Sequence, residues 1–253
     1  MKQSSEFWDK MAKRYPRYYD EAMQKDAKII FDTARGFGID FSDKSIVDIG
    51  CGTGTLAIPL ASKAKNIVAL DLSKPMLDIF EKDRDELDLN QKIEIYHTSW
   101  DEYLLRESFD IALASMTPAV GNKEQYDKFI KSTNRYAIFV GWGAYKDNDV
   151  IDAIVEKLGA EKKQNLNQAK RFANYLEEQK IHHQVSFFET SWNNSYSFNE
   201  AIEYCCSHLK NLQLDVDKKL IEKLLQEYCT DASVVFTTSA QKGIVVCDKS
   251  SKQ

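Results

Sequence analysis

The chain has 253 residues, which suits one large α/β domain or a domain with an insertion but would cramp two full domains. Hydrophobic residues make up 43% and charged residues 29%, and the net charge of −5 is spread along the chain, which disfavours tight binding along a phosphate backbone. The N-terminus lacks the apolar core of a signal peptide, no apolar run is long enough to cross a bilayer, and the five cysteines and four histidines form no disulfide or metal-ligand pattern. We therefore expect a cytoplasmic protein with free thiols, no metal site and no membrane partner.

Two helices are predicted ahead of the first strand. Apolar and aromatic residues recur at helical spacing from Phe7 to Tyr15, and Pro16 then interrupts the pattern. A second helix is predicted from about Arg17 to Gly36.

A glycine-rich turn follows the first predicted strand, residues 45–49, and leads into an apolar helical segment. Strand, glycine-rich turn and helix are the means by which an open α/β sheet brings backbone close to a nucleotide-like ligand. The next predicted strand ends at Asp71, 21 residues after Gly50, near the offset of about twenty residues at which a carboxylate accepts hydrogen bonds from ribose hydroxyls. The third glycine of a dinucleotide fingerprint would fall at Thr55, which disfavours a nicotinamide-dependent oxidoreductase.

Strands and helices alternate through the rest of the first half, which predicts βαβ units and a mainly parallel sheet. Further strands are predicted at residues 93–97, 111–115 and 136–140, with a helix at 123–131 before the last of them. Beyond residue 143 the predicted elements are helices at 149–158 and 168–179, a strand at 183–190, helices at 198–209 and about 220–228, and a strand at 243–247. A capping box formed by Ser197 and Glu200 opens the helix at 198–209.

Three segments together resemble the class I S-adenosylmethionine-dependent methyltransferases. They are the pattern Asp48-x-Gly50-x-Gly52-x-Gly54, residues 69–77 at the second strand, and residues 108–115 at the fourth strand. The resemblance implies a three-layer, Rossmann-like α/β fold with a seven-stranded, mostly parallel sheet whose last strand lies antiparallel between the fifth and sixth. On this scheme residues 1–253 form a single domain with a helical cap at 1–42, a core at 43–191, a helical insertion at 192–232, and the final strand and tail at 233–253.

The resemblance also implies S-adenosylmethionine as the cofactor and S-adenosylhomocysteine as its product. The glycine turn would pass under the methionine portion and the ribose, Asp48 would hold the turn or the cofactor's ammonium group, and Asp71 would take the ribose hydroxyls. The predicted cofactor contacts are Asp48, Gly50, Cys51, Gly52, Gly54, Asp71, Leu72, Met76, Ser99, Trp100 and Ser115.

Several of these predictions have a plainer alternative. Cys51 is expected to serve as a small residue rather than a reactive thiol. Leu72 and Met76 are predicted beside the adenine, but both also suit a core position. Ser99 and Trp100 are predicted at the adenine edge, with Asp101 as the second choice, while Trp100 also suits the core.

The acceptor side is predicted from the strand ends and the leading helices, which in the resembled family pack over the cofactor cleft. The candidates for acceptor contact are Tyr15, Tyr19, Thr117, Trp142 and Trp192. The plainer explanation for Tyr15 and Tyr19 is that they are aromatics buried against the domain. His182 and His183 precede the sixth strand, at the sheet edge away from the cleft, so no catalytic residue is assigned.

The predicted reaction is in-line methyl transfer from S-adenosylmethionine to a small molecule. Because the electrophile is already activated, positioning and desolvation can supply much of the catalysis without a nucleophile on the protein. The absence of an Asn-Pro-Pro-Tyr or Asp-Pro-Pro-Tyr tetrad after the fourth strand disfavours methylation of DNA adenine or of release-factor glutamine. Methylation of a protein or RNA, and cofactor binding without catalysis, remain open; the acceptor atom and the oligomeric state are not predicted.

Overall fold

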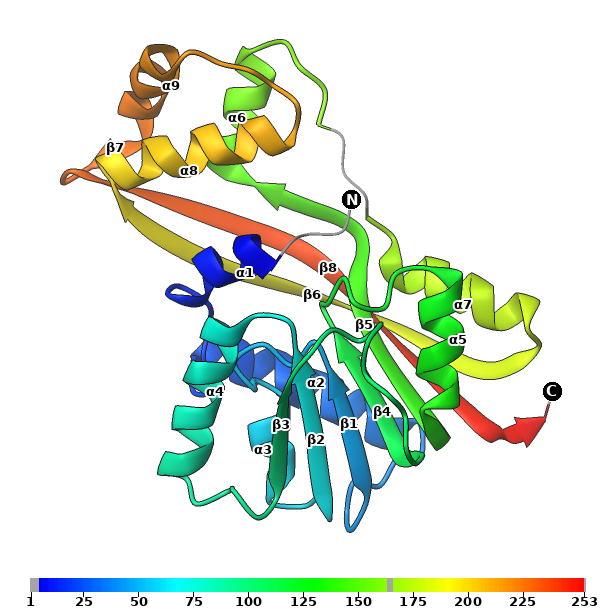
Figure 1. The fold of residues 1–253 in the computed structure, drawn as a ribbon. Helices are drawn as coiled ribbons and strands as arrows, with labels where there is room; N and C mark the ends of the chain where they lie inside the picture. Colours follow the sequence, from blue (N-terminus) through cyan, green and yellow to red (C-terminus); the bar gives the residue numbers. More distant parts are fainter. Residues whose placement is uncertain (1–4, 163–165, 253) are drawn as a thin grey trace. The chain divides into compact units, whose positions relative to one another are not determined.

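The computed structural model describes residues 5–162 and 166–252. Residues 1–4, 163–165 and 253, which belong to the predicted cap, core and tail, lie outside the described residues. The chain divides into two compact units, the first made of residues 1–142, 167–188 and 242–253 and the second of residues 143–166 and 189–241. Each unit is described separately, with its elements labelled as in Figure 1.

Two helices precede the sheet of the first unit, α1 (Ser5–Ala12) and α2 (Glu21–Gly36). The predicted start of the second helix near Arg17 is therefore wrong by about one turn. The reason is local, because Asp20 is extended, its carboxylate accepts the backbone N–H of Arg17 at 2.7 Å, and its own N–H closes a turn onto the Arg17 carbonyl at 3.0 Å.

The sheet confirms the predicted α/β class and the implied place of the last long strand between the fifth and sixth. Its strands follow the order β3-β2-β1-β4-β5-β8-β6, and β1 is paired in parallel with both β2 and β4. The bounds are β1 (Ser45–Ile49), β2 (Asn66–Asp71), β3 (Ile93–His97), β4 (Phe109–Ser115), β5 (Thr133–Asn148), β6 (Ile181–Ser197) and β8 (Ser233–Lys252). The arrowheads in Figure 1 show β8 running opposite to β5 and β6, as the resemblance implies. A two-residue strand, β7 (Cys229–Thr230), pairs antiparallel with the start of β8 and is the eighth strand of a sheet predicted to have seven.

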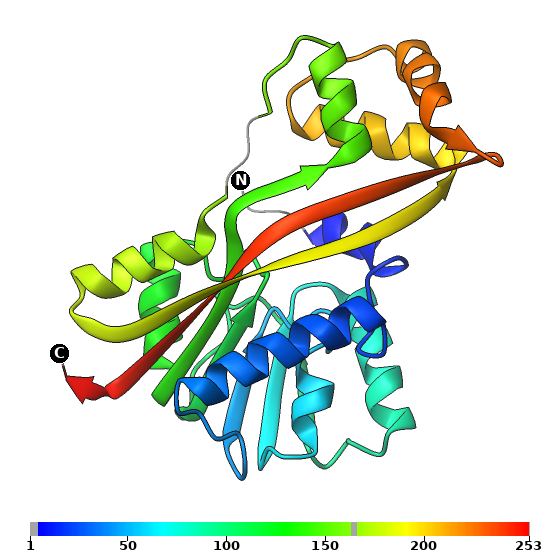
Figure 2. The ribbon, with the colours of Figure 1, turned by 180° about the vertical axis from the view of Figure 1, so that it is seen from behind.

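Helices cover both faces of the sheet in the first unit, so the expected three layers are present (Figure 2). One apolar cluster joins one face of the sheet to α2, α3 (Ala57–Ala61) and α4 (Lys74–Glu86). A second cluster joins the other face to α5 (Lys123–Lys131) and α7 (Gln168–Glu178). Ile46 belongs to the first cluster and its neighbour Val47 to the second, as the alternation of side chains along a doubly covered parallel strand requires.

The second unit has its own apolar cluster, built on α6 (Asp149–Lys157), α8 (Phe198–Asn211), α9 (Lys218–Leu225) and the first part of β8. The predicted capping box is confirmed at the start of α8, where the Glu200 carboxylate accepts the Ser197 N–H at 3.1 Å. A short 3₁₀ turn at residues 226–228 follows α9. The helices predicted as an insertion at 192–232 thus share a core with α6, which lies earlier in the chain.

Three strands are much longer than predicted, because β5, β6 and β8 each continue from one unit into the other. Apolar runs mark only the parts inside the first unit. Beyond them, the glycines of β5 and the polar residues of β6 break the apolar runs on which the predicted strand lengths depended.

The last glycine of the turn after β1 serves packing. Gly54 has φ +77°, and a Cβ atom there would overlap the ring of Phe80, which is fully buried on α4. Gly54 therefore lets α4 approach the turn closely.

We predict that Gly54→Ala lowers the free energy of unfolding by about 2–4 kcal/mol. Alanine is strained at the positive φ of this position, and its Cβ would overlap the ring of Phe80. Urea denaturation measures the change. Gly36→Ala is the matched control, since a Cβ at Gly36 meets no atom within 4 Å. Equal stability of the two variants would contradict the packing role of Gly54.

Candidate active site

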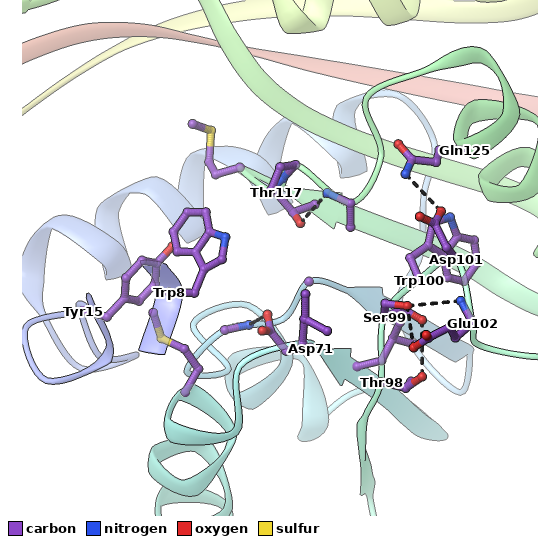
Figure 3. A pocket seen from close by; sticks show the side chains of 18 residues that line it. Trp8, Tyr15, Asp71, Thr98, Ser99, Trp100, Asp101, Glu102, Thr117 and Gln125 are labelled. Carbon is purple, nitrogen blue, oxygen red and sulfur yellow. Dashed lines mark hydrogen bonds between the residues drawn. The ribbon is translucent and has the colours of Figure 1, made fainter. Parts of the chain in front are cut away.

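A cavity of about 250 Å³ lies in the first unit where β1, β2, β3 and β4 end (Figure 3). Its wall combines the glycine turn after β1, the end of β2, the segments that follow β3 and β4, and two aromatic residues of the N-terminal segment. The carboxyl ends of parallel strands are where open α/β sheets bind their ligands. The lining residues are Trp8, Tyr15, Gly50, Gly52, Leu70, Asp71, Leu72, Met76, Thr98, Ser99, Trp100, Asp101, Glu102, Met116, Thr117, Pro118, Ala119 and Gln125.

Asp71 is held rigidly at the centre of this wall. One carboxylate oxygen accepts the backbone N–H of Gly52 at 2.9 Å, and the other accepts that of Ser73 at 2.8 Å. Burial raises the pKa of Asp71, while the N–H groups of Ser73 and Gly52 act in the opposite direction. Each carboxylate oxygen can accept a further hydrogen bond, so Asp71 is oriented to receive two hydroxyl donors from the cavity.

Asp48 lies behind the glycine turn and not on the cavity wall. It is 3% exposed, and burial, with a further contribution from the charge of Asp71, raises its pKa to about 7. Two neighbouring, largely buried carboxylates favour a cationic ligand close by, because a positive charge would offset their repulsion and stabilise their charged forms.

The first two glycines of the turn face the cavity. Gly50 and Gly52 have φ of +68° and +54°, a Cβ at Gly50 would overlap the side chain of Thr117, and a Cβ at Gly52 would lie 3.5 Å from the Tyr15 ring. Cys51 between them is buried, and burial together with the charges of Asp71 and Asp48 raises the pKa of its thiol. The protonated thiol agrees with the predicted role of Cys51 as a small residue.

The segment after β3 forms the polar end of the cavity. Ser99 donates to the Glu102 carboxylate at 2.9 Å, and the side-chain amide of Gln125 donates to Asp101 at 3.0 Å. Trp100 is 2% exposed, and its indole N–H has no hydrogen-bond partner among the residues described. Carboxylates and hydroxyl groups suit the amino group and ring nitrogens of adenine, so this end fits the cofactor.

Two aromatic rings form the roof of the cavity. Trp8 from α1 meets Tyr15 edge to face, with ring centroids 6.3 Å apart at 79°. Burial, and secondarily the charge of Asp71, raises the pKa of Tyr15 to about 12, so its hydroxyl stays protonated at neutral pH. Tyr15 is therefore a wall and a hydrogen-bond donor rather than a general base.

The structure brings together most of the predicted site residues but not all. Gly54, Asp48, Cys51 and Ser115 do not line the cavity, and neither do Tyr19, Trp142 and Trp192. Tyr19 is 53% exposed and contacts the ring of Tyr18 edge to face, while Trp192 belongs to the second unit.

Other residues of the wall were missed. Trp8, Met116 and Gln125 line the cavity, yet the sequence shows them only as members of apolar or helical patterns. No local signal marks Gln125, because its contact with Asp101 joins residues 24 positions apart.

Within the part of the chain that the structure describes, no group of three or more histidine, cysteine, aspartate and glutamate side chains could hold a metal ion, and no helix is long and apolar enough to cross a bilayer. The five cysteines are free.

Comparison with known proteins identifies the fold and the family. Residues 46–137 match the family described as a methyltransferase domain. This segment is a methyltransferase domain of the class I, S-adenosylmethionine-dependent type. S-adenosylmethionine is therefore the cofactor that the cavity has to accommodate.

Curated relatives share only part of their length with this chain. It is 31% identical to the cypemycin N-terminal methyltransferase of a Streptomyces species over 34% of this chain and 33% of the relative. It is 30% identical to an uncharacterized protein of Haemophilus influenzae over 45% of this chain and 43% of the relative. The chain thus spans less than half the length of these two relatives.

Solved structures show a similar fold. The magnesium protoporphyrin IX methyltransferase of Synechocystis, solved with S-adenosylhomocysteine, has a TM-score of 0.54 and 11% identity, covering 90% of this chain and 83% of its own. The geranyl diphosphate C-methyltransferase of Streptomyces coelicolor has a TM-score of 0.51 and 14% identity, covering 89% of this chain and 79% of its own. Identities this low support the fold alone.

We predict that Asp71→Ala weakens S-adenosylhomocysteine binding by ~1–3 kcal/mol, because ribose hydroxyls would lose their acceptor. Isothermal titration calorimetry measures the affinity. Asp78→Ala, which removes an exposed carboxylate from α4, is the control and should bind as the parent does. Unchanged affinity in Asp71→Ala would refute the ribose assignment.

We also predict a pH dependence of stability that arises from Asp48. Its pKa is raised in the folded state from 3.8 to about 7, so its contribution to stability is present below pH ~4 and is lost as the pH rises through about 7. Urea denaturation of the ligand-free protein between pH 5 and 8 should show this decline, and Asp48→Asn should reduce it. If the stability of Asp48→Asn falls with pH as that of the parent does, the raised pKa of Asp48 is not the cause of the decline.

Proposed function

We propose that this protein is a methyltransferase that transfers a methyl group from S-adenosylmethionine to a small-molecule acceptor. The observation that carries the proposal is the fixed carboxylate of Asp71, bonded to the backbone of Gly52 at 2.9 Å on the wall of a cavity at the strand ends. This arrangement offers two acceptor oxygens and an open backbone surface to a ribose with an amino-acid substituent.

When bound, S-adenosylmethionine supplies a methyl group on positively charged sulfur, an electrophile that needs no further activation. Asp71 would hold the ribose hydroxyls, and Gly50 and Gly52 would let the ligand lie against the backbone. Trp8 and Tyr15 would exclude water from the reacting centre. The contribution of these residues is orientation and desolvation, because Tyr15 is protonated at neutral pH and no other side chain is assigned as a base.

The charge of the wall supports a small acceptor that is neutral or cationic. The charged side chains that line the cavity are Asp71, Asp101 and Glu102, and no lysine, arginine or histidine of the described residues lines it. A wall whose charged side chains are all carboxylates disfavours the close approach of phosphates and other anions, and so disfavours nucleic acids and anionic metabolites as acceptors.

A peptide amine is a second candidate acceptor. The name of the Streptomyces relative places its reaction at the N-terminus of cypemycin, and the matching region of the two chains is 31% identical. A terminal amine shares the positive or neutral charge that this wall favours. Cofactor binding without catalysis is the third possibility, and release of S-adenosylhomocysteine would rule it out.

The test is incubation of the protein with methyl-labelled S-adenosylmethionine and a cell extract split into small-molecule, protein and RNA fractions. We expect label to enter the small-molecule fraction, mainly in compounds retained by a cation exchanger, with release of S-adenosylhomocysteine. Label confined to protein or RNA would overturn the small-molecule proposal. Tight cofactor binding without release of product from any fraction would favour the non-catalytic alternative.

A further inference from the structure

The segment of residues 5–20, which carries Trp8 and Tyr15, is tied to the cofactor wall by buried polar groups. The Thr53 hydroxyl donates to the carbonyl of Pro16 at 2.7 Å, and Thr53 itself is fully buried within the glycine turn. Because a buried hydroxyl without a partner costs free energy, the turn is complete only when this segment is in place.

Ser73 connects the same segment to Asp71, whose carboxylate is the proposed acceptor of the ribose hydroxyls. Its hydroxyl donates to Asp9 of α1 at 2.6 Å, and its backbone N–H donates to Asp71 at 2.8 Å. Ser73 is fully buried at the start of α4, and α1 packs on α4. The position of α1 is thereby coupled to the residue that orients Asp71.

Arg17 makes the strongest of these attachments. Its Nε donates to one oxygen of Asp83 at 2.6 Å, and its Nη2 donates to the other oxygen, which makes the pair bidentate. The side chain of Asp83 is 2% exposed on α4, whereas that of Arg17 is 24% exposed. A buried carboxylate held by a planar two-pronged donor defines both the distance and the direction of the attached chain.

Neither Arg17 nor Asp83 lines the cavity, yet Arg17 lies two residues after Tyr15. The Tyr15 ring lies beside Gly52, and burial together with the charge of Asp71 raises the pKa of its hydroxyl. Small shifts of residues 13–17 therefore move the ring that covers Gly52 and Asp71. The ion pair between Arg17 and Asp83 therefore affects the cavity through the position of the Tyr15 ring in its roof.

We propose that Arg17, acting through Asp83, and Asp9, acting through Ser73, are positioning residues that hold the aromatic roof against Asp71 and set how long the cofactor stays bound. The proposal rests on the proposed function for the identity of the ligand. It assigns a role in cofactor retention to two charged residues that do not touch the cavity.

The first test compares Arg17→Gln with Arg17→Lys and with Lys13→Gln, an exposed site on the same segment. Chase of labelled S-adenosylhomocysteine by filter binding gives the dissociation rate, and stopped-flow fluorescence gives the association rate. We expect Arg17→Gln to raise the dissociation rate about tenfold with an association rate within threefold of the parent, Arg17→Lys to recover part of the loss, and Lys13→Gln to match the parent. A dissociation rate for Arg17→Gln within twofold of Lys13→Gln would overturn the proposal.

A second variant separates positioning from stability. Arg17→Gln alone leaves a buried charge at Asp83, which destabilises the fold, whereas the double variant Arg17→Gln/Asp83→Asn removes that charge. We expect the double variant to regain the thermal midpoint while its dissociation rate stays about tenfold above the parent. If the thermal midpoint and the dissociation rate of the double variant both return to the parent values, the ion pair has only a structural role and the proposal is overturned.

Trypsin cleavage makes the test independent of the cofactor. Cleavage after Lys10 and Lys13 should be faster in Arg17→Gln and in Asp9→Ala than in the parent, because the segment would be released from α4. If the parent does not bind S-adenosylhomocysteine, the proposed function fails, and the cleavage rates still decide whether Arg17 and Asp9 anchor the segment. Equal cleavage in all three proteins would refute the anchoring.

Discussion

The hydrogen bond between the backbone of Gly52 and the carboxylate of Asp71 is the contact on which the site depends. It joins the turn after β1 to the end of β2, two segments that parallel pairing already brings side by side. Because the donor is backbone, its position follows from the sheet itself, while the second donor, Ser73, comes from the start of the next helix. The sheet register and the position of the Asp71 carboxylate are thus parts of one arrangement.

The electrostatics of the site follow from that arrangement. Asp48 and Asp71 lie on adjacent strands, where burial raises the pKa of both carboxyl groups and the charge of Asp71 raises that of Asp48 further. Such a pair is costly without a compensating charge, and a sulfonium cofactor with an ammonium group supplies one. The same excess of negative charge on the wall is the basis of the proposed preference for a neutral or cationic acceptor.

The N-terminal segment completes the cavity from outside the sheet. Its contacts reach three buried polar groups, Thr53, Ser73 and Asp83, which belong to the glycine turn and to α4. Each of these groups would lack a partner if the segment moved away, so the roof is part of the folded core and also part of the ligand site. Retention of the cofactor and stability of the turn are coupled for this reason.

The sequence alone determined the α/β class, the alternation of strands and helices, and several residues of the cavity wall, because glycine spacing, strand-end acids and apolar runs are local patterns. Asp71, Gly52 and Thr117 were found this way. Only the tertiary structure decided the extent of β5, β6 and β8, the core shared by α6 and α8, and the place of Trp8 and Gln125 on the cavity wall. These features depend on contacts between residues far apart in the chain, and such contacts leave no periodic pattern in the amino-acid order.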